Sequence, residues 1–159
     1  MNFSSFIGQA KTAIDEKGRS AFPREFRRVL AQDEGEDLVL AFGPQRSLIL
    51  FVRDEYEKYV ASLEARRKTP QTEMFRRKFK ASAHQFGLDG QNRVMLPKMH
   101  LEYAGLNGDV LYVARSGKSL ELWNPAVYQS LHGFNSPEDY SAFDAGFYDD
   151  GFGEDSHDR

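Results

Sequence analysis

The chain has 159 residues, of which 40% are hydrophobic and 13% aromatic, and its formal net charge is −3 at pH 7. This composition is typical of a globular protein with room for one domain or two small interlocked ones. No apolar run approaches the roughly 18–20 residues of a membrane span, and no secretory signal pattern is present. The sequence has no cysteine, which excludes disulfides and thiolate metal sites, and we expect a cytoplasmic protein.

The first part of the chain predicts a strand, a charged turn, a second strand and a helix. Residues 9–14 alternate loosely between apolar and polar and end at a charged loop that contains Gly18. A short strand is predicted at residues 19–22. Pro23 follows it, and since proline is well tolerated in the first turn of a helix, we expect a helix to begin there.

A hairpin and two helices come next. Gly43 and Pro44 separate two apolar runs, which indicates a turn between two strands. Asp54 is the expected cap of the first helix and Thr69 that of the second. The predicted bounds are residues 38–42 and 48–52 for the strands, and about 54–68 and 70–82 for the helices.

The same order of elements then recurs. The loop Asp89-Gly90-Gln91-Asn92-Arg93 repeats Asp15-Glu16-Lys17-Gly18-Arg19 at an offset of 74 residues, and a proline follows each Arg four residues later. We therefore predict an internal duplication whose two small halves fold as one pseudo-symmetric unit. The elements predicted for the second copy are strands up to residue 88 and at 93–96, 110–114 and 120–123, and helices at 97–104 and 125–131.

These patterns divide the chain into four segments. We expect a first repeat at residues 6–56, connecting helices at 57–82, a second repeat at 83–131 and an acidic, flexible tail at 132–159. From Gly133 onward the tail holds eight acidic residues and one Arg, which gives it a net charge of −7. The body of the chain, residues 1–132, has a net charge of +4. Such a tail either solvates the protein or competes with an anionic partner of the body. No helix or strand is predicted beyond Gly133.

The repeated loop has a structural role that needs no ligand. Asp15 can accept hydrogen bonds from backbone N–H groups of its own turn, and Gly18 supplies a positive φ. In the second loop Asp89 repeats the carboxylate, and Asn92 is the next residue most tolerant of positive φ. The Arg of each loop has two interpretations: an ion pair with its neighbouring Asp, or a guanidinium directed at phosphates or guanine edges. Both hold if the Asp orients the Arg.

The two loops, the prolines that follow them and the segment 101–106 (Leu-Glu-Tyr-Ala-Gly-Leu) resemble the MraZ family. The resemblance implies two tandem SpoVT/AbrB-type swapped-hairpin domains. The implied fold is α+β and mainly β, with a pseudo-twofold, barrel-like core and flanking helices.

The resemblance also implies a function. It implies a transcription factor that binds double-stranded DNA at short promoter repeats of a division and cell-wall gene cluster. It further implies a nucleoid-associated, ring-shaped homo-oligomer with no cofactor and no small-molecule substrate. Arg19 and Arg93 match the family's loop arginines and are the first DNA-binding candidates. Lys11, Lys17 and Gln91, on or near the same loops, are the others.

Basic residues gather in two places. Residues 9–28 contain six Lys and Arg against three acids, which favours contact with phosphates near the first loop. Residues 66–80 contain seven Lys and Arg against Glu73. The second group is either a surface for non-specific DNA binding or the solvated face of a connecting helix. In the latter case we expect three apolar residues of that helix, Met74, Phe75 and Phe79, to pack inward.

Enzyme classes are disfavoured by the sequence. The four histidines are scattered without metal-ligand spacing, and no nucleophile motif or phosphate-binding loop is present. His100 aligns with Phe26 and is expected to fill a helix face. We therefore predict no catalytic residues and no metal site.

Two alternatives to the transcription factor stay open. One is an antitoxin-like DNA binder whose tail binds a toxin, which the aromatic residues of the tail favour. These residues are Phe134, Tyr140, Phe143, Phe147, Tyr148 and Phe152. The other is a scaffold ring that binds no DNA.

Overall fold

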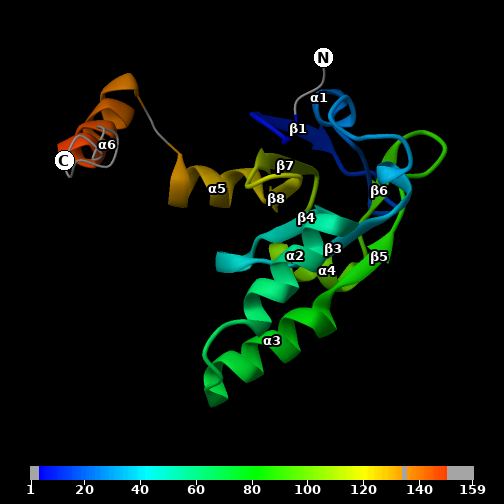
Figure 1. Cartoon of the computed structure of the whole chain (residues 1–159). Helices are drawn as coiled ribbons and strands as arrows, with labels where there is room; N and C mark the ends of the chain where they lie inside the picture. Colours follow the sequence, from blue (N-terminus) through cyan, green and yellow to red (C-terminus); the bar gives the residue numbers. More distant parts are fainter. Residues whose placement is uncertain (1–3, 134–135, 150–159) are drawn as a thin grey trace. The chain divides into compact units, whose positions relative to one another are not determined.

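The computed structural model describes residues 4–133 and 136–149 (Figure 1). The chain divides into two compact units, residues 1–125 and 126–159, and each is described by itself. The described strands of the first unit are β1 (Gln9–Ala13), β2 (Arg19–Ala21), β3 (Leu38–Phe42), β4 (Leu48–Val52), β5 (His84–Phe86), β6 (Arg93–Met95), β7 (Asp109–Ala114) and β8 (Ser119–Trp123). Its described helices are α1 (Arg24–Arg27), α2 (Arg53–Glu64), α3 (Pro70–Ser82) and α4 (Lys98–Ala104), with 3-10 turns at Glu34–Glu36 and Pro44–Arg46.

The predicted duplication appears directly in the strand order. The larger sheet has the order β1-β7-β8-β4-β3-β5, and β2 pairs with β6 in a separate two-stranded ribbon. In this sheet the counterparts in the two halves are β1 and β5, β3 and β7, and β4 and β8. When each strand is exchanged with its counterpart, the same order results, read from the opposite edge of the sheet. A pseudo-twofold axis therefore passes between β4 and β8. The halves are also swapped, because β1 pairs with β7 and β5 with β3.

The fold class expected from the sequence is confirmed: the unit is α+β and mainly β, built on antiparallel strands. The sheet is nevertheless open, with β1 and β5 at its edges, so the core is not a closed barrel.

The core lies on both faces of the sheet. One cluster packs the sheet against β2, β6 and α1 and includes Phe22, Phe26 and Val94. The other cluster packs β3 and β4 against α2 and α3 and includes Phe51 and Phe79. Each fully buried side chain of this size stabilises the fold by about 1.5–3 kcal/mol. Strands β3 and β4 therefore have apolar residues at nearly every position instead of alternating ones.

Several helix starts differ from the prediction. Helix α2 begins at Arg53 and has no side-chain cap, so the assignment of Asp54 as its cap was wrong. The backbone N–H of Arg53 donates instead to the carbonyl of Asp37 (3.2 Å), which satisfies one of the helix's first donors. Pro23 and Pro97 lie just before α1 and α4, with extended ψ values, and not inside them. The predicted start of α3 is confirmed, because Thr69 and Thr72 form a capping box.

Helix α5 (Pro125–His132) begins at the last residue of the first unit and otherwise belongs to the second, which also contains α6 (Pro137–Asp149). The absence of any predicted element beyond Gly133 was therefore wrong. Ser136 Oγ accepts from the backbone N–H of Asp139 (3.2 Å), and Pro137 and two acids occupy the first turn, which is a strong helix start. Phe134 and Phe152 of the predicted aromatic tail lie outside the described residues. Within the described ranges, no helix is long and apolar enough to cross a membrane.

Candidate nucleic-acid interface

The first candidate loop, between β1 and β2, is organised by the carboxylate of Asp15. Asp15 Oδ1 accepts from the backbone N–H groups of Lys17 and Arg19, both at 2.9 Å. Asp15 Oδ2 accepts from Arg19 Nε, also at 2.9 Å. Gly18 has φ 82°, and a Cβ there would lie 3.1 Å from the carbonyl oxygen of Leu96. The turn therefore depends on a glycine as well as on the carboxylate.

The second loop, between β5 and β6, repeats these bonds. Asp89 Oδ1 accepts from the backbone N–H groups of Gln91 (2.8 Å) and Arg93 (2.9 Å). Asp89 Oδ2 accepts from Arg93 Nε at 2.8 Å. Asn92 takes the left-handed conformation of the first loop's glycine, with φ 60°. The replacement of glycine by asparagine thus leaves the loop geometry unchanged, as the sequence indicated.

Hydrogen bonding keeps both carboxylates ionised. The backbone N–H of Arg19 is the main cause that lowers the pKa of Asp15 below its ordinary value, although partial desolvation opposes it. The backbone N–H of Arg93 lowers the pKa of Asp89 in the same way. At neutral pH each loop therefore holds a carboxylate that fixes one guanidinium.

Each ion pair engages only one edge of its guanidinium. The side chains of Arg19 and Arg93 are 26% and 28% exposed, and both bind their Asp through Nε. Among the residues that the structure describes, the two terminal nitrogens of each Arg have no hydrogen-bond partner. In each loop the two terminal nitrogens of an oriented guanidinium are thus left available to donate.

The β2–β6 ribbon brings the two loops together. The strands pair around Ser20 and Val94, which are buried, whereas Arg19 and Arg93 lie on the opposite, outward face. In the register of the ribbon these arginines are diagonal neighbours, a relation with a separation of roughly 7–8 Å and a somewhat shorter distance between the Cβ atoms. The two guanidiniums therefore belong to one surface.

A buried pair of hydroxyl groups connects the inner face of this ribbon to the sheet. Ser20 Oγ hydrogen-bonds the phenol of Tyr112, which is fully buried in β7. Burial raises the pKa of Tyr112 well above its ordinary value, so the phenol stays neutral. Sequence reasoning missed this contact, because nothing in the local pattern connects two residues 92 positions apart.

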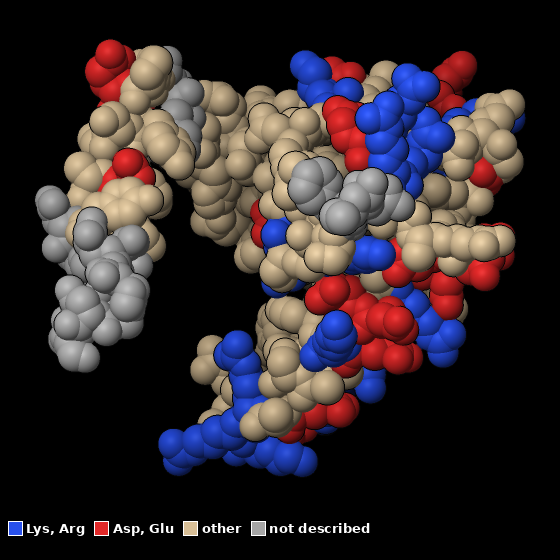
Figure 2. All heavy atoms as spheres, turned by 45° about the horizontal axis from the view of Figure 1, so that its top comes forward, with Lys and Arg blue, Asp and Glu red and all other residues tan. Residues whose placement is uncertain are grey.

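The remaining DNA-binding candidates occupy different places. Lys17 and Gln91 are exposed at equivalent positions of the two loops. Lys11 is exposed on β1, at the edge of the sheet and outside either loop. Figure 2 shows Lys and Arg side chains gathered over the part of the molecule where Figure 1 labels α1 and β6, with acidic side chains among and beside them.

The second basic region covers α3 and the turn before it. Phe79 is buried, but Met74 and Phe75 are 48% and 50% exposed, so the expectation that all three pack inward was wrong. The inner position on α3 is already filled by Phe79, which packs on Phe51 and Tyr59. Phe75 lies one turn before Phe79 on α3, and its ring stacks on that of Phe79.

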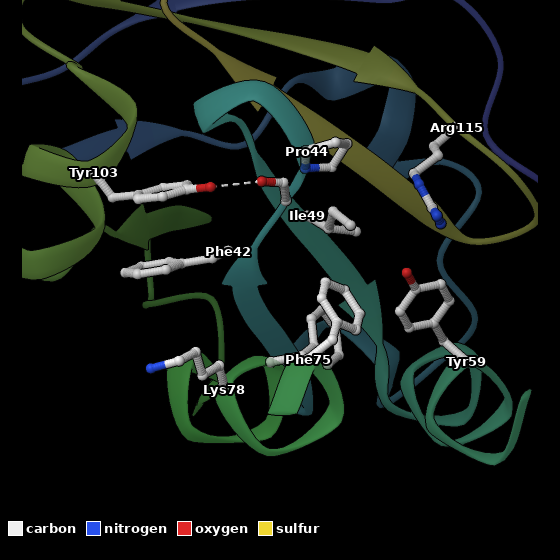
Figure 3. A pocket seen from close by; sticks show the side chains of 10 residues that line it. Phe42, Pro44, Ile49, Tyr59, Phe75, Lys78, Tyr103 and Arg115 are labelled. Atoms are coloured by element: carbon white, nitrogen blue, oxygen red, sulfur yellow. Dashed lines mark hydrogen bonds between the residues drawn. The ribbon is translucent and has the colours of Figure 1, made fainter. Parts of the chain in front are cut away.

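A groove of about 250 Å³ lies beside Phe75 (Figure 3). Its walls include the stacked rings of Phe42 and Tyr103, whose centroids are 3.9 Å apart. The phenol of Tyr103 donates to the carbonyl of Gly43 (2.7 Å), which fixes that wall. Lys78 and Arg115 also line the groove, so it is an aromatic surface with cations beside it.

An internal duplication, swapped strands and paired Asp–Arg loops define this unit as a tandem swapped-hairpin protein. The family model described as "MraZ protein, putative antitoxin-like" matches residues 5–78 and 79–140. The chain belongs to the MraZ family, which confirms the resemblance that the sequence suggested.

Curated relatives are similar over most of their length. A protein of Corynebacterium jeikeium is 32% identical over 86% of this chain and 92% of its own. One of Shewanella halifaxensis is 34% identical over 78% and 82%, and one of an Anaeromyxobacter species is 33% identical over 84% and 93%. All three are named transcriptional regulator MraZ.

Proposed function

We propose that this chain is a transcriptional regulator that binds double-stranded DNA through the outward face of the β2–β6 ribbon and its two loops. The main support is the pair of Asp-held arginines on one face of the ribbon, whose terminal nitrogens have no hydrogen-bond partner among the described residues. The names of the relatives, transcriptional regulator MraZ, support it.

Arg19 and Arg93 are suited to contact base edges. A guanidinium can donate two parallel hydrogen bonds to O6 and N7 of guanine in the major groove. The Asp holds Nε in place, so little side-chain freedom is lost when the remaining nitrogens bind. A two-stranded ribbon fits the major groove, which is about 12 Å wide. The separation of roughly 7–8 Å between diagonal neighbours corresponds to about two base steps of about 3.4 Å.

The neighbouring candidates have supporting roles. Lys17 and Lys11 would neutralise phosphates, which gives affinity that is independent of sequence and falls with salt. The amide of Gln91 matches the N6 and N7 edge of adenine. In the first loop a lysine occupies the equivalent position.

The biological setting is proposed from the family. We propose a ring-shaped homo-oligomer that binds several short repeats upstream of a division and cell-wall gene cluster, in the nucleoid of the cytoplasm. Exposed Met74 and Phe75 support an interface between subunits, because neighbouring exposed apolar side chains often mark contact surfaces, and Phe75 also lines the groove. The names of the relatives fit a protein that is not an enzyme.

An antitoxin-like DNA binder is the second candidate. Four aromatic side chains of helix α6 are between 46% and 66% exposed: Tyr140, Phe143, Phe147 and Tyr148. The matched family description also contains the term antitoxin-like. In this version the same loops bind DNA and α6 contacts a protein partner. A chain lacking residues 133–159 would then keep its DNA affinity but lose that partner.

Binding of the purified chain to its own upstream region tests the proposal. Footprinting would locate the repeats, and fluorescence anisotropy would give affinities for the footprinted and a scrambled duplex at several salt concentrations. We expect log affinity to fall linearly with log salt, and a clear preference for the footprinted sequence. A protein that binds neither duplex at any salt concentration is a scaffold and not a regulator of this kind.

A further inference from the structure

The outward face of the β2–β6 ribbon carries apolar side chains as well as arginines. Residues of this face alternate with the buried Ser20 and Val94. The face consists of Arg19, Ala21, Arg93 and Met95. Met95 is 47% exposed although it has a long apolar side chain.

The register places each apolar residue directly opposite one of the arginines. Arg19 pairs with Met95, and Arg93 pairs with Ala21. The ladder bonds run from the N–H of Phe22 to the carbonyl of Asn92 and from the N–H of Leu96 to that of Gly18. Bonded and non-bonded pairs alternate along an antiparallel ribbon, so both Arg pairs are non-hydrogen-bonded pairs. Such pairs have Cα atoms about 4.5 Å apart and close side chains.

The duplication preserves the arginines of this face but not their neighbours. Each apolar residue lies two positions after the Arg of its own strand, and the second copy has methionine where the first has alanine. Methionine and arginine have long, unbranched side chains, so their tips reach a similar distance from the ribbon. The side chain of alanine ends at Cβ. The two ends of the face are therefore alike in charge and different in apolar reach.

The major groove offers one apolar group that such a side chain can contact. The 5-methyl group of thymine is exposed there, and apolar side chains distinguish thymine by touching it. The thioether of methionine is flexible and polarisable, which suits a contact with a methyl group. A neighbouring guanidinium that binds guanine would hold the DNA at the required depth.

We propose that Met95 contacts the 5-methyl group of a thymine next to the base bound by Arg19, and that Ala21 makes no equivalent contact beside Arg93. The inference rests on the proposed function, since it assigns a specificity residue to the same surface. With this contact, the protein recognises the two ends of its DNA sequence differently. One end of each recognised sequence requires a thymine methyl group, and the pseudo-symmetric end does not.

Deoxyuridine substitution tests this contact, because deoxyuridine lacks only the 5-methyl group of thymine. Each thymine of the footprinted duplex is replaced in turn, and the affinity of the full-length chain is measured by anisotropy. We expect one thymine, at the Arg19 end, whose replacement weakens binding about three- to fivefold, the effect of one buried methyl group. Met95→Ala should weaken binding of the thymine duplex by a similar factor and remove the sensitivity to that deoxyuridine.

Two further variants complete the design. Met95→Leu should keep the sensitivity, and Ala21→Met should create a second sensitive thymine at the Arg93 end. Both positions are exposed, so thermal unfolding should stay close to that of the unmodified chain. Arg19-dependent binding with no sensitive thymine overturns the Met95 contact and leaves the proposed function standing. Absence of any DNA binding overturns both.

Discussion

Leu96 donates its backbone N–H to the carbonyl oxygen of Gly18 at 2.8 Å, so a residue of the second half closes the loop of the first. The reverse bond runs from Phe22 to Asn92 at 2.9 Å. The two Asp–Arg loops are therefore parts of one structure, and each depends on the other half of the chain. This reciprocity explains how a duplicated sequence gives a single face that carries both loop arginines.

Gly18→Ala should destabilise the protein by about 1–3 kcal/mol, the cost of placing a side chain at positive φ. The new Cβ would also approach the Leu96 carbonyl to 3.1 Å. Urea unfolding would measure the change. Gly90→Ala is the matched control, because a Cβ there contacts nothing within 4 Å, and it should be neutral or slightly stabilising. Equal effects of the two substitutions would contradict the role assigned to Gly18.

Arg19→Ala should reduce affinity for the footprinted duplex about 10- to 100-fold, because a bidentate base contact contributes about 1–3 kcal/mol of discrimination. Affinity for scrambled DNA should change much less. Arg28→Ala removes an exposed Arg just after α1 and should weaken both duplexes nearly alike, with a shallower salt dependence. If Arg19→Ala leaves the preference intact while the protein stays folded, the ion pair with Asp15 is the whole purpose of the residue.

The loops should also give the protein a defined acid sensitivity. The pKa values of Asp15 and Asp89 are lowered in the folded state, so their hydrogen bonds contribute stability above the ordinary Asp pKa of 3.8. That contribution should be lost as pH falls through the lowered values. Urea midpoints between pH 7 and pH 3 would show a steeper loss for the unmodified chain than for Asp15→Asn/Asp89→Asn. Parallel curves would show that the carboxylates are not coupled to folding.

Phe75→Glu should shrink the proposed homo-oligomer without unfolding the subunit, because the side chain is half exposed and lies beside the aromatic groove. Mass photometry would report the subunit number. Arg77→Glu places a carboxylate at an exposed position of the same helix, with a change of charge twice as large, and should leave the number unchanged. An unchanged oligomer in Phe75→Glu would place the interface elsewhere.

Local patterns predicted the elements well. The strand bounds at 38–42 and 48–52 agree with β3 and β4, because long apolar runs between turn residues have few alternatives. The conformation of Asn92 also followed from residue chemistry, since asparagine tolerates positive φ. The start of α6 was missed although Ser136 and Pro137 signal it. The acidic, glycine-containing composition of the tail favours disorder, whereas its capping residues favour a helix.

Relations between distant residues could not be obtained from the residues alone. The contact of Ser20 with Tyr112 and the pairing of Arg19 with Met95 depend on which strands become neighbours. The exposure of Phe75 depends on how much of α3 the sheet covers, which helical periodicity does not reveal. The candidate site was therefore predictable as two loops but not as one ribbon face with its apolar members.

In the function proposed above, Arg19 and Arg93 together recognise DNA sequence. The most direct measurement is the affinity of Arg19→Ala/Arg93→Ala for the footprinted and the scrambled duplex, by anisotropy at several salt concentrations, with circular dichroism to confirm folding. We predict that the double variant binds both duplexes equally and keeps a salt-dependent, non-specific affinity. A folded double variant that still prefers the footprinted duplex would contradict the account.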